Sequence, residues 1–124
     1  MFHINAKSRE PIYEQLEKLI IKYISLKIIL PGEQLPSVRS MAQELGVNPN
    51  TVQKAYSSLE DSGFVFTVVG KGVFVCNNDK KVSAIQEVSL QRLKEMSRAA
   101  MNAGVMLDKQ LEAIRRVFEE EKND

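Results

Sequence analysis

The chain has 124 residues, enough for one domain or a small domain with an appendage, and its hydrophobic content of 44% supports a packed core. A single cysteine and a single histidine exclude an intrachain disulfide and a four-ligand zinc site, and no apolar run approaches the ~20 residues of a membrane helix. The net charge of +1 excludes bulk basicity, so a DNA-binding surface would need local placement of charge.

The N-terminal region predicts a short arm followed by a helix. Residues 2–4 alternate weakly and favour a short strand or an ordered arm. The first ten residues lack the apolar segment of a secretory signal, so we expect a cytoplasmic protein. A helix is expected from Pro11, since proline suits the first helical position, and Pro31-Gly32 predicts a turn after it. The buried face of this helix would hold Ile12, Leu16, Leu19, Ile20, Tyr23 and Ile24.

Residues 36–63 hold two short amphipathic helical patterns separated by one tight turn. Ser37 suits the N-cap of the first helix and Gly46 its C-terminal end, while Asn48-Pro49 restarts a helix. Two helices joined by a short turn that contains glycine predict a helix-turn-helix. The apolar stripes are Val38, Met41, Ala42 and Leu45, then Val52, Ala55, Tyr56 and Leu59.

Two β-rich runs follow, Phe64–Val69 and Val73–Cys76, around Gly70-Lys71-Gly72. They predict a hairpin with a turn that glycine permits. A hairpin directly after a helix-turn-helix suggests the wing of a winged helix, with Lys71 at its tip against a groove or the DNA backbone. The glycines are not a phosphate-binding P-loop, because the GxxxxGK[ST] spacing is missing.

The last third predicts two helices interrupted at Gly104, preceded by a polar linker or helix start over residues 77–81. Its first apolar stripe is close to a heptad seam, and a shorter stripe follows the glycine. We expect a helical hairpin whose apolar face is too large for two short helices to bury alone. A second copy of the chain would cover it, through Ile85, Leu93, Met96, Leu107, Leu111, Ile114 and Phe118.

The outward face of the second helix of the helix-turn-helix is polar. Asparagine and glutamine can pair bidentately with adenine, and lysine can reach guanine or phosphate. The alternative is an ordinary solvated helix face. No nucleophile–base pair is signalled, so we expect no enzyme activity, no metal and no cofactor. The face shows Asn50, Thr51, Gln53, Lys54, Ser57 and Ser58.

The order of these residues resembles the GntR family of bacterial transcription regulators, and its YtrA-type subfamily in particular. The strings PIYEQL, LPSVRSMAQELGVNPNTVQKAY and GKGVFV carry the resemblance, which runs from about Phe2 to Val75. It implies a mainly α chain with a small β-hairpin: a winged helix-turn-helix over residues 1–77 and a two-helix dimerisation module over residues 78–124.

The resemblance also implies a homodimer that binds a palindromic operator on double-stranded DNA, usually to repress transcription. Lys27 stands where a glycine often ends the first helix, and Val69 and Val73 make the wing less cationic than is usual. Relatives with larger C-terminal domains bind effectors, but about 45 residues after the wing are too few to enclose a ligand pocket. The implied DNA contacts are Arg39, Asn48, Asn50, Thr51, Gln53, Lys54, Gly70 and Lys71.

Two alternatives remain open at the level of sequence. The chain could be an effector-gated regulator with a small ligand at the dimer interface or between its two modules. The winged helix could instead be a protein-interaction module, and the near-neutral charge would then explain why it ignores DNA. Salt-dependent retention on duplex DNA separates this last class from a DNA-binding regulator.

Overall fold

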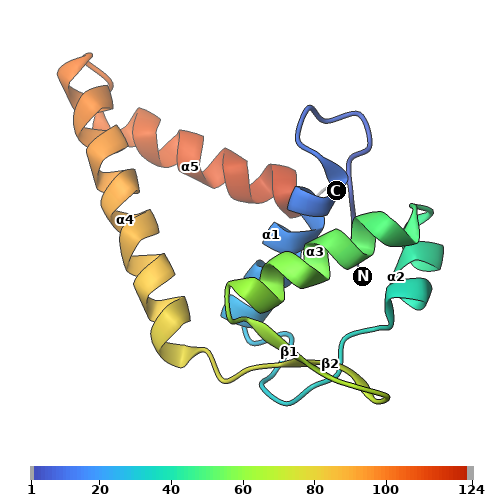
Figure 1. Cartoon of the computed structure of the whole chain (residues 1–124). Helices are drawn as coiled ribbons and strands as arrows, with labels where there is room; N and C mark the ends of the chain where they lie inside the picture. The colour runs from blue at the N-terminus through green and yellow to red at the C-terminus, as the bar shows by residue number, and fades with distance from the viewer. Residues whose placement is uncertain (1, 123–124) are drawn as a thin grey trace. The chain divides into compact units, whose positions relative to one another are not determined.

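The computed structural model describes residues 2–122 and divides the chain into two compact units, Met1–Asp79 and Lys80–Asp124 (Figure 1). Five helices and one two-stranded sheet are present among these residues, which confirms a mainly α chain with a small β-hairpin. In chain order the elements are α1 (Ile12–Ser25), α2 (Val38–Leu45), α3 (Pro49–Asp61), β1 (Val65–Val68), β2 (Gly72–Val75), α4 (Asp79–Asn102) and α5 (Leu107–Lys122).

The core of the first unit is built around α3. This helix packs against α1 and α2, and β1 packs against it in turn. The predicted stripe of α3 is buried, from Val52 to Leu59, and α1 contributes Leu16 and Ile20 to the same core. Because removal of apolar surface from water is the main favourable term in folding, this burial fixes which face of α3 is left to solvent.

Side-chain caps define the two helices of the helix-turn-helix. The Ser37 hydroxyl accepts a hydrogen bond from the backbone N–H of Ser40 at 3.0 Å, and the Asn48 side-chain oxygen accepts one from the N–H of Asn50 at 2.8 Å. Gly46 ends α2 with φ +68°, the left-handed conformation that glycine adopts most readily. The predicted cap residues are therefore confirmed.

The N-terminal region differs from the prediction in its details. α1 begins at Ile12, with Pro11 as its N-cap rather than its first residue. Of the two alternatives for residues 2–4, the structure shows the arm: Phe2 is in irregular backbone, and its buried ring lies 5.3 Å from the ring of Tyr23, centroid to centroid. After α1 the chain turns through Lys27, whose φ of +59° lies in the left-handed region that favours glycine.

The hairpin is antiparallel, and each strand covers four residues, with Val65 opposite Val75. Cys76, expected at the end of the second strand, lies just beyond β2 and is half-buried. A linker or a helix start was expected for the polar segment that follows, and the helix start is confirmed, since α4 begins at Asp79. Asn78 is buried, and its side-chain nitrogen donates to the backbone oxygens of Phe64 and Cys76 at 3.2 and 2.8 Å.

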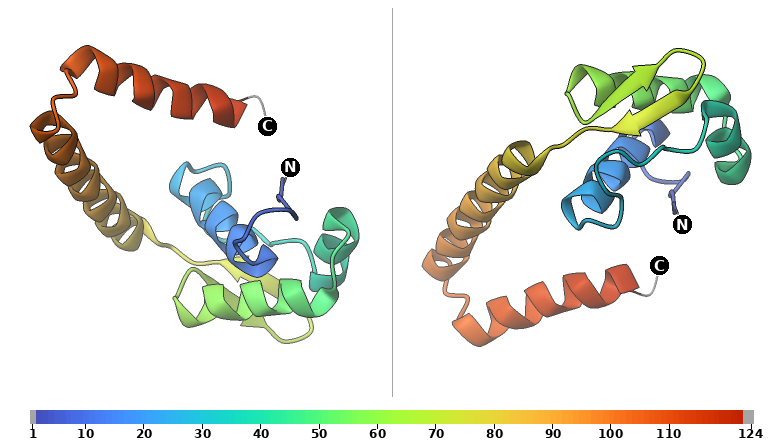
Figure 2. Two further views of the ribbon diagram at one scale, coloured as in Figure 1. Left: turned by 90° about the horizontal axis from the view of Figure 1, so that it is seen from above. Right: turned by 90° about the horizontal axis from the view of Figure 1, so that it is seen from below.

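The second unit consists of α4 and α5, which meet at a turn where Gly104 has φ +88°. The two helices diverge from this turn instead of lying side by side (Figure 1; Figure 2). Near the turn the Ser97 hydroxyl donates to the Gln110 side-chain oxygen, and the Gln110 nitrogen donates to the backbone oxygen of Val105 at 3.1 Å. The apolar residues of the predicted interface are all at least 38% exposed in the single chain.

Candidate nucleic-acid interface

The outward face of α3 carries the predicted base-reading side chains. Asn50 and Gln53 are exposed, and Thr51 is half-buried at the edge of the stripe. The Gln53 side-chain nitrogen donates to the Ser57 hydroxyl at 3.1 Å, one turn further along the helix. This hydrogen bond orients the Gln53 carboxamide along the surface of α3.

Lys54, on the same helix, is held by α1. Its ammonium nitrogen lies 4.1 Å from the centroid of the Tyr13 ring, within cation–π range. The Tyr13 hydroxyl donates to a carboxylate oxygen of Glu14 at 3.1 Å, and this hydrogen bond, with the Glu14 charge, raises the pKa of Tyr13. Tyr13 was absent from the expected contacts because it lies just outside the apolar stripe of α1. Its place beside that stripe was the only sequence signal for a contact with α3.

Two further predicted residues sit at the helix starts. Arg39 is exposed in the first turn of α2. Asn48 is exposed as well, but its side-chain oxygen serves as the cap of α3. Asn48 therefore orders the first turn of α3: the N–H of Asn50 donates to its side-chain oxygen at 2.8 Å and the N–H of Thr51 to its backbone oxygen at 2.9 Å.

The turn of the hairpin presents Lys71 between two glycines. Gly70 has φ +79° and Gly72 has φ +135°, and the Lys71 side chain is exposed. The Lys71 N–H donates to the backbone oxygen of Val68 at 2.9 Å and closes the turn. Within the first unit, both Figure 1 and Figure 2 show the hairpin turn on the same side as α2. The cationic tip and the start of the helix-turn-helix thus belong to one side of this unit.

A buried hydrogen bond ties α3 to the segment in front of α2. The Tyr56 hydroxyl donates to the backbone oxygen of Pro36 at 2.7 Å, and Tyr56 is 2% exposed. Burial, with a smaller effect from the Glu44 charge, raises the pKa of Tyr56 well above its ordinary value. The neutral phenol is therefore the stable form, and it fixes the start of α2 relative to α3.

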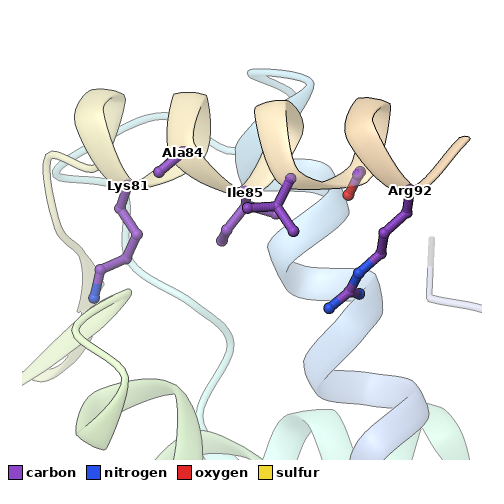
Figure 3. A pocket seen from close by; sticks show the side chains of 6 residues that line it. Lys81, Ala84, Ile85 and Arg92 are labelled. Carbon is purple, nitrogen blue, oxygen red and sulfur yellow. The ribbon is translucent and has the colours of Figure 1, made fainter. Parts of the chain in front are cut away.

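The described residues were also compared with the requirements of a metal site, a membrane span and a ligand pocket. Within residues 2–122 no cluster of three or more His, Cys, Asp or Glu could hold a metal ion, and no helix in that range is long and apolar enough to cross a membrane. A hollow of about 380 Å³ lies along α4, and Figure 3 shows side chains that project into it from one side of that helix. All its lining residues are exposed: Lys81, Ala84, Ile85, Val88, Ser89 and Arg92.

Comparison with known sequences finds regulators of transcription. The sequence profile described as "Bacterial regulatory proteins, gntR family" matches residues 11–75. Over 119 residues the chain is 36% identical to the HTH-type transcriptional repressor YtrA of Bacillus subtilis (strain 168), covering 94% of this chain and 92% of that protein.

Solved structures agree with the sequence comparison. A transcriptional regulator from Oenococcus oeni superposes with a TM-score of 0.72 at 28% identity, covering 95% of this chain and 99% of that one. The AraR DNA-binding domain in complex with operator ORE1 superposes with a TM-score of 0.53 at 29% identity, covering 61% of this chain and 93% of that one. One of these similar structures is thus a DNA-binding domain in complex with its operator.

Proposed function

The chain belongs to the GntR family of bacterial regulatory proteins, and from this premise we propose that it represses transcription by binding a palindromic operator as a homodimer. Family membership confirms the predicted winged-helix fold and the prediction of a transcriptional regulator rather than an enzyme. A repressor of this kind acts where the chromosome lies, so we also propose a cytoplasmic location.

The observation that carries the proposal is the exposed, polar N-terminal end of α3. Asn50 and Gln53 present carboxamides there, which suit the donor and acceptor pattern of adenine in the major groove. Thr51 lies between them and suits a base edge or a phosphate. Recognition helices present their N-terminal ends to bases, and the Asn48 cap holds this end in place.

Positive charge around this end is proposed to contact the phosphate backbone. Arg39 approaches from α2, and Lys71 from the hairpin turn with the backbone of Gly70 beside it. Lys54 is fixed against Tyr13, so we assign it a backbone contact of defined position. With a net charge of only +1, affinity depends on these few placed cations.

The exposed apolar side chains of the second unit support the proposed homodimer. α4 and α5 diverge, and α4 has no buried residue in the single chain. Contiguous apolar side chains on both helices are unfavourable in water and mark a protein interface. A second copy brings an equal apolar surface, and its two-fold symmetry matches a palindromic site with half-sites ~34 Å apart or at a multiple of that spacing.

The effector-gated alternative has weaker support. The hollow along α4 combines the apolar Ile85 and Val88 with the cations Lys81 and Arg92, and its volume of about 380 Å³ is within the range of ligand sites. Every lining side chain is exposed, however, so the second unit by itself does not enclose a ligand there. Ile85 also belongs to the proposed dimer interface.

The test is selection of duplexes from a random-sequence library by the purified full-length chain, with sedimentation analysis of the free protein. We expect enrichment of an inverted repeat and a mass of two chains. No enrichment over a non-specific duplex would overturn the DNA-binding function. Enrichment by a chain that sediments as a monomer would overturn the dimer alone.

A further inference from the structure

We propose that Gln34 is a positioning residue that holds Lys71 at the hairpin tip and so controls how strongly the tip contacts the DNA backbone. Gln34 lies before α2 and precedes Lys71 by 37 positions. The inference deepens the DNA-binding function proposed above and rests on it. It concerns a polar, exposed residue that no sequence pattern singles out.

The side chain of Gln34 reaches the backbone of the tip. Its nitrogen Nε2 donates to the backbone oxygen of Lys71 at 2.8 Å. The N–H of Lys71 is already bonded to the oxygen of Val68 at 2.9 Å. Both main-chain polar groups of Lys71 are therefore held, one by the hairpin itself and one by Gln34. The orientation of this peptide decides where the Lys71 side chain begins.

The neighbouring glycine makes room for this contact. Gly72 has φ +135°, and a Cβ atom added to it would collide with Nε2 of Gln34. The carboxamide of Gln34 thus fills the space that any side chain at position 72 would need. Glycine at this position serves the Gln34 contact as well as the backbone conformation of the turn.

Main-chain pairing holds Gln34 in place beside the hairpin. Gln34 itself forms an antiparallel bridge with Phe74. On either side of the bridge, the N–H of Leu35 donates to the oxygen of Val73 at 2.9 Å, and the N–H of Val75 donates to the oxygen of Glu33 at 2.9 Å. The segment before α2 therefore acts as a short third strand along β2, and Gln34 extends from it to the tip.

The same segment is bonded to α3 at its next residue. Pro36 accepts the hydrogen bond from the buried Tyr56 hydroxyl, two positions after Gln34. A continuous series of contacts consequently joins α3, Pro36, Gln34 and Lys71. Hairpins of two short strands have little stability of their own, so a tip fixed to a third segment is better ordered than a free one. Gln34 is the last link, and its loss should loosen the tip without unfolding the core.

The experiment uses full-length variants and a thermodynamic cycle. Gln34→Met keeps the length of the side chain and removes the donor, while Gln43→Met makes the same change at an exposed position of α2. Each is combined with Lys71→Ala. Fluorescence anisotropy then gives affinity for the duplex selected by the wild-type chain and for a scrambled duplex, over a series of salt concentrations.

We expect Gln34→Met to weaken binding of both duplexes about two- to tenfold, as expected for loss of one hydrogen bond. The salt dependence should become shallower, because the tip contacts phosphate less well. In the Lys71→Ala background the same change should have no further effect, and Gln43→Met should match the wild type throughout. Equal losses with and without Lys71 would mean that Gln34 contacts DNA directly, and an unchanged affinity would remove its role; either result overturns the proposal.

Backbone ¹⁵N relaxation of the DNA-free protein separates this inference from the function on which it rests. We expect Gln34→Met to increase mobility at residues 70–72 and to leave the helices unchanged. A rise in mobility throughout the first unit would assign Gln34 to general stability and contradict the proposal. If the wild-type chain binds no duplex, the repressor function fails, whereas the relaxation result still decides whether Gln34 orders the tip.

Discussion

The ammonium of Lys54 lies 4.1 Å from the centre of the Tyr13 ring, so a cation on the outward face of α3 is held by α1. The attraction between a cation and an aromatic face keeps this charge at a defined place on the candidate interface. Glu14 accepts the Tyr13 hydroxyl hydrogen bond and keeps the ring oriented. The contact therefore joins α1 and α3 at the protein surface, outside the apolar core.

Tyr13→Leu should therefore weaken binding of selected and scrambled duplexes alike, because Lys54 loses the ring that positions it. Tyr13→Phe keeps the aromatic face and should bind nearly as well as the wild type. Anisotropy titrations of both variants provide the comparison. If Tyr13→Phe binds as weakly as Tyr13→Leu, the hydroxyl rather than the ring is the important group.

Gln53→Ala should weaken binding of the selected duplex by roughly 1–3 kcal/mol and leave scrambled DNA almost unaffected, as expected for a bidentate base contact. The ratio of the two affinities in a gel-shift titration is the measurement. Gln91→Ala makes the same change at an exposed position of α4 and is the matched control. Equal losses on both duplexes would reassign Gln53 to the phosphate backbone.

Leu111→Glu should convert the dimer to monomer, because it places a charge in the apolar face of α5. Leu111 is 49% exposed in the single chain, so the change should not unfold the monomer. Sedimentation velocity measures the mass, and circular dichroism verifies the helix content. Gln91→Glu adds the same charge at an exposed position of α4 outside the predicted stripe and should remain dimeric. A dimeric Leu111→Glu protein would place the interface elsewhere.

Alkaline pH should destabilise the protein through Tyr56. Its pKa is raised in the folded state, so the folded protein keeps the phenolic proton at pH values where the unfolded chain releases it. The associated stability is present below the ordinary tyrosine pKa of about 10 and falls as the pH rises above it.

Urea unfolding at several pH values tests this expectation. Tyr56→Phe should lower stability near neutral pH by about 1 kcal/mol, through loss of the hydrogen bond to Pro36, and should show a flatter decline above pH ~10. The assignment fails if Tyr56→Phe declines as steeply as the wild type.

Lys27→Gly should stabilise the first unit by about 1 kcal/mol, because the left-handed conformation at φ +59° is strained for a residue with a Cβ atom. Thermal unfolding measures the difference. Lys22→Gly, inside α1, is the opposing control and should destabilise by about 1 kcal/mol. A lower melting temperature for Lys27→Gly would show that the lysine side chain contributes more than the strain removes.

Local features of the fold were predictable from sequence because their causes are local. Ser37, Gly46 and Asn48 are recognised by residue type and by their place beside an apolar stripe, and the structure confirms all three. The shorter strands and the half-buried Cys76 show the usual uncertainty at element ends.

Long-range contacts were not predictable in the same way. Asn78 is buried, and its side-chain nitrogen donates to the backbone oxygens of Phe64 and Cys76, although the polar segment around it predicted only a linker or a helix start. The pairing of Lys54 with Tyr13 depends on how α1 crosses α3. Likewise, the heptad-like stripe of α4 identified an apolar face but gave no information on the angle between α4 and α5. The individual DNA contacts remain predictions.

The cap at Asn48 and the hydrogen bond from Tyr56 to Pro36 leave the start of α3 little freedom to adapt. When the protein is rigid at the point of contact, the duplex must supply the adjustment. Base steps between the two half-sites, which the helices never touch, would then influence affinity through how easily they bend or twist. Operators with identical half-sites and different central sequences would accordingly be repressed to different degrees.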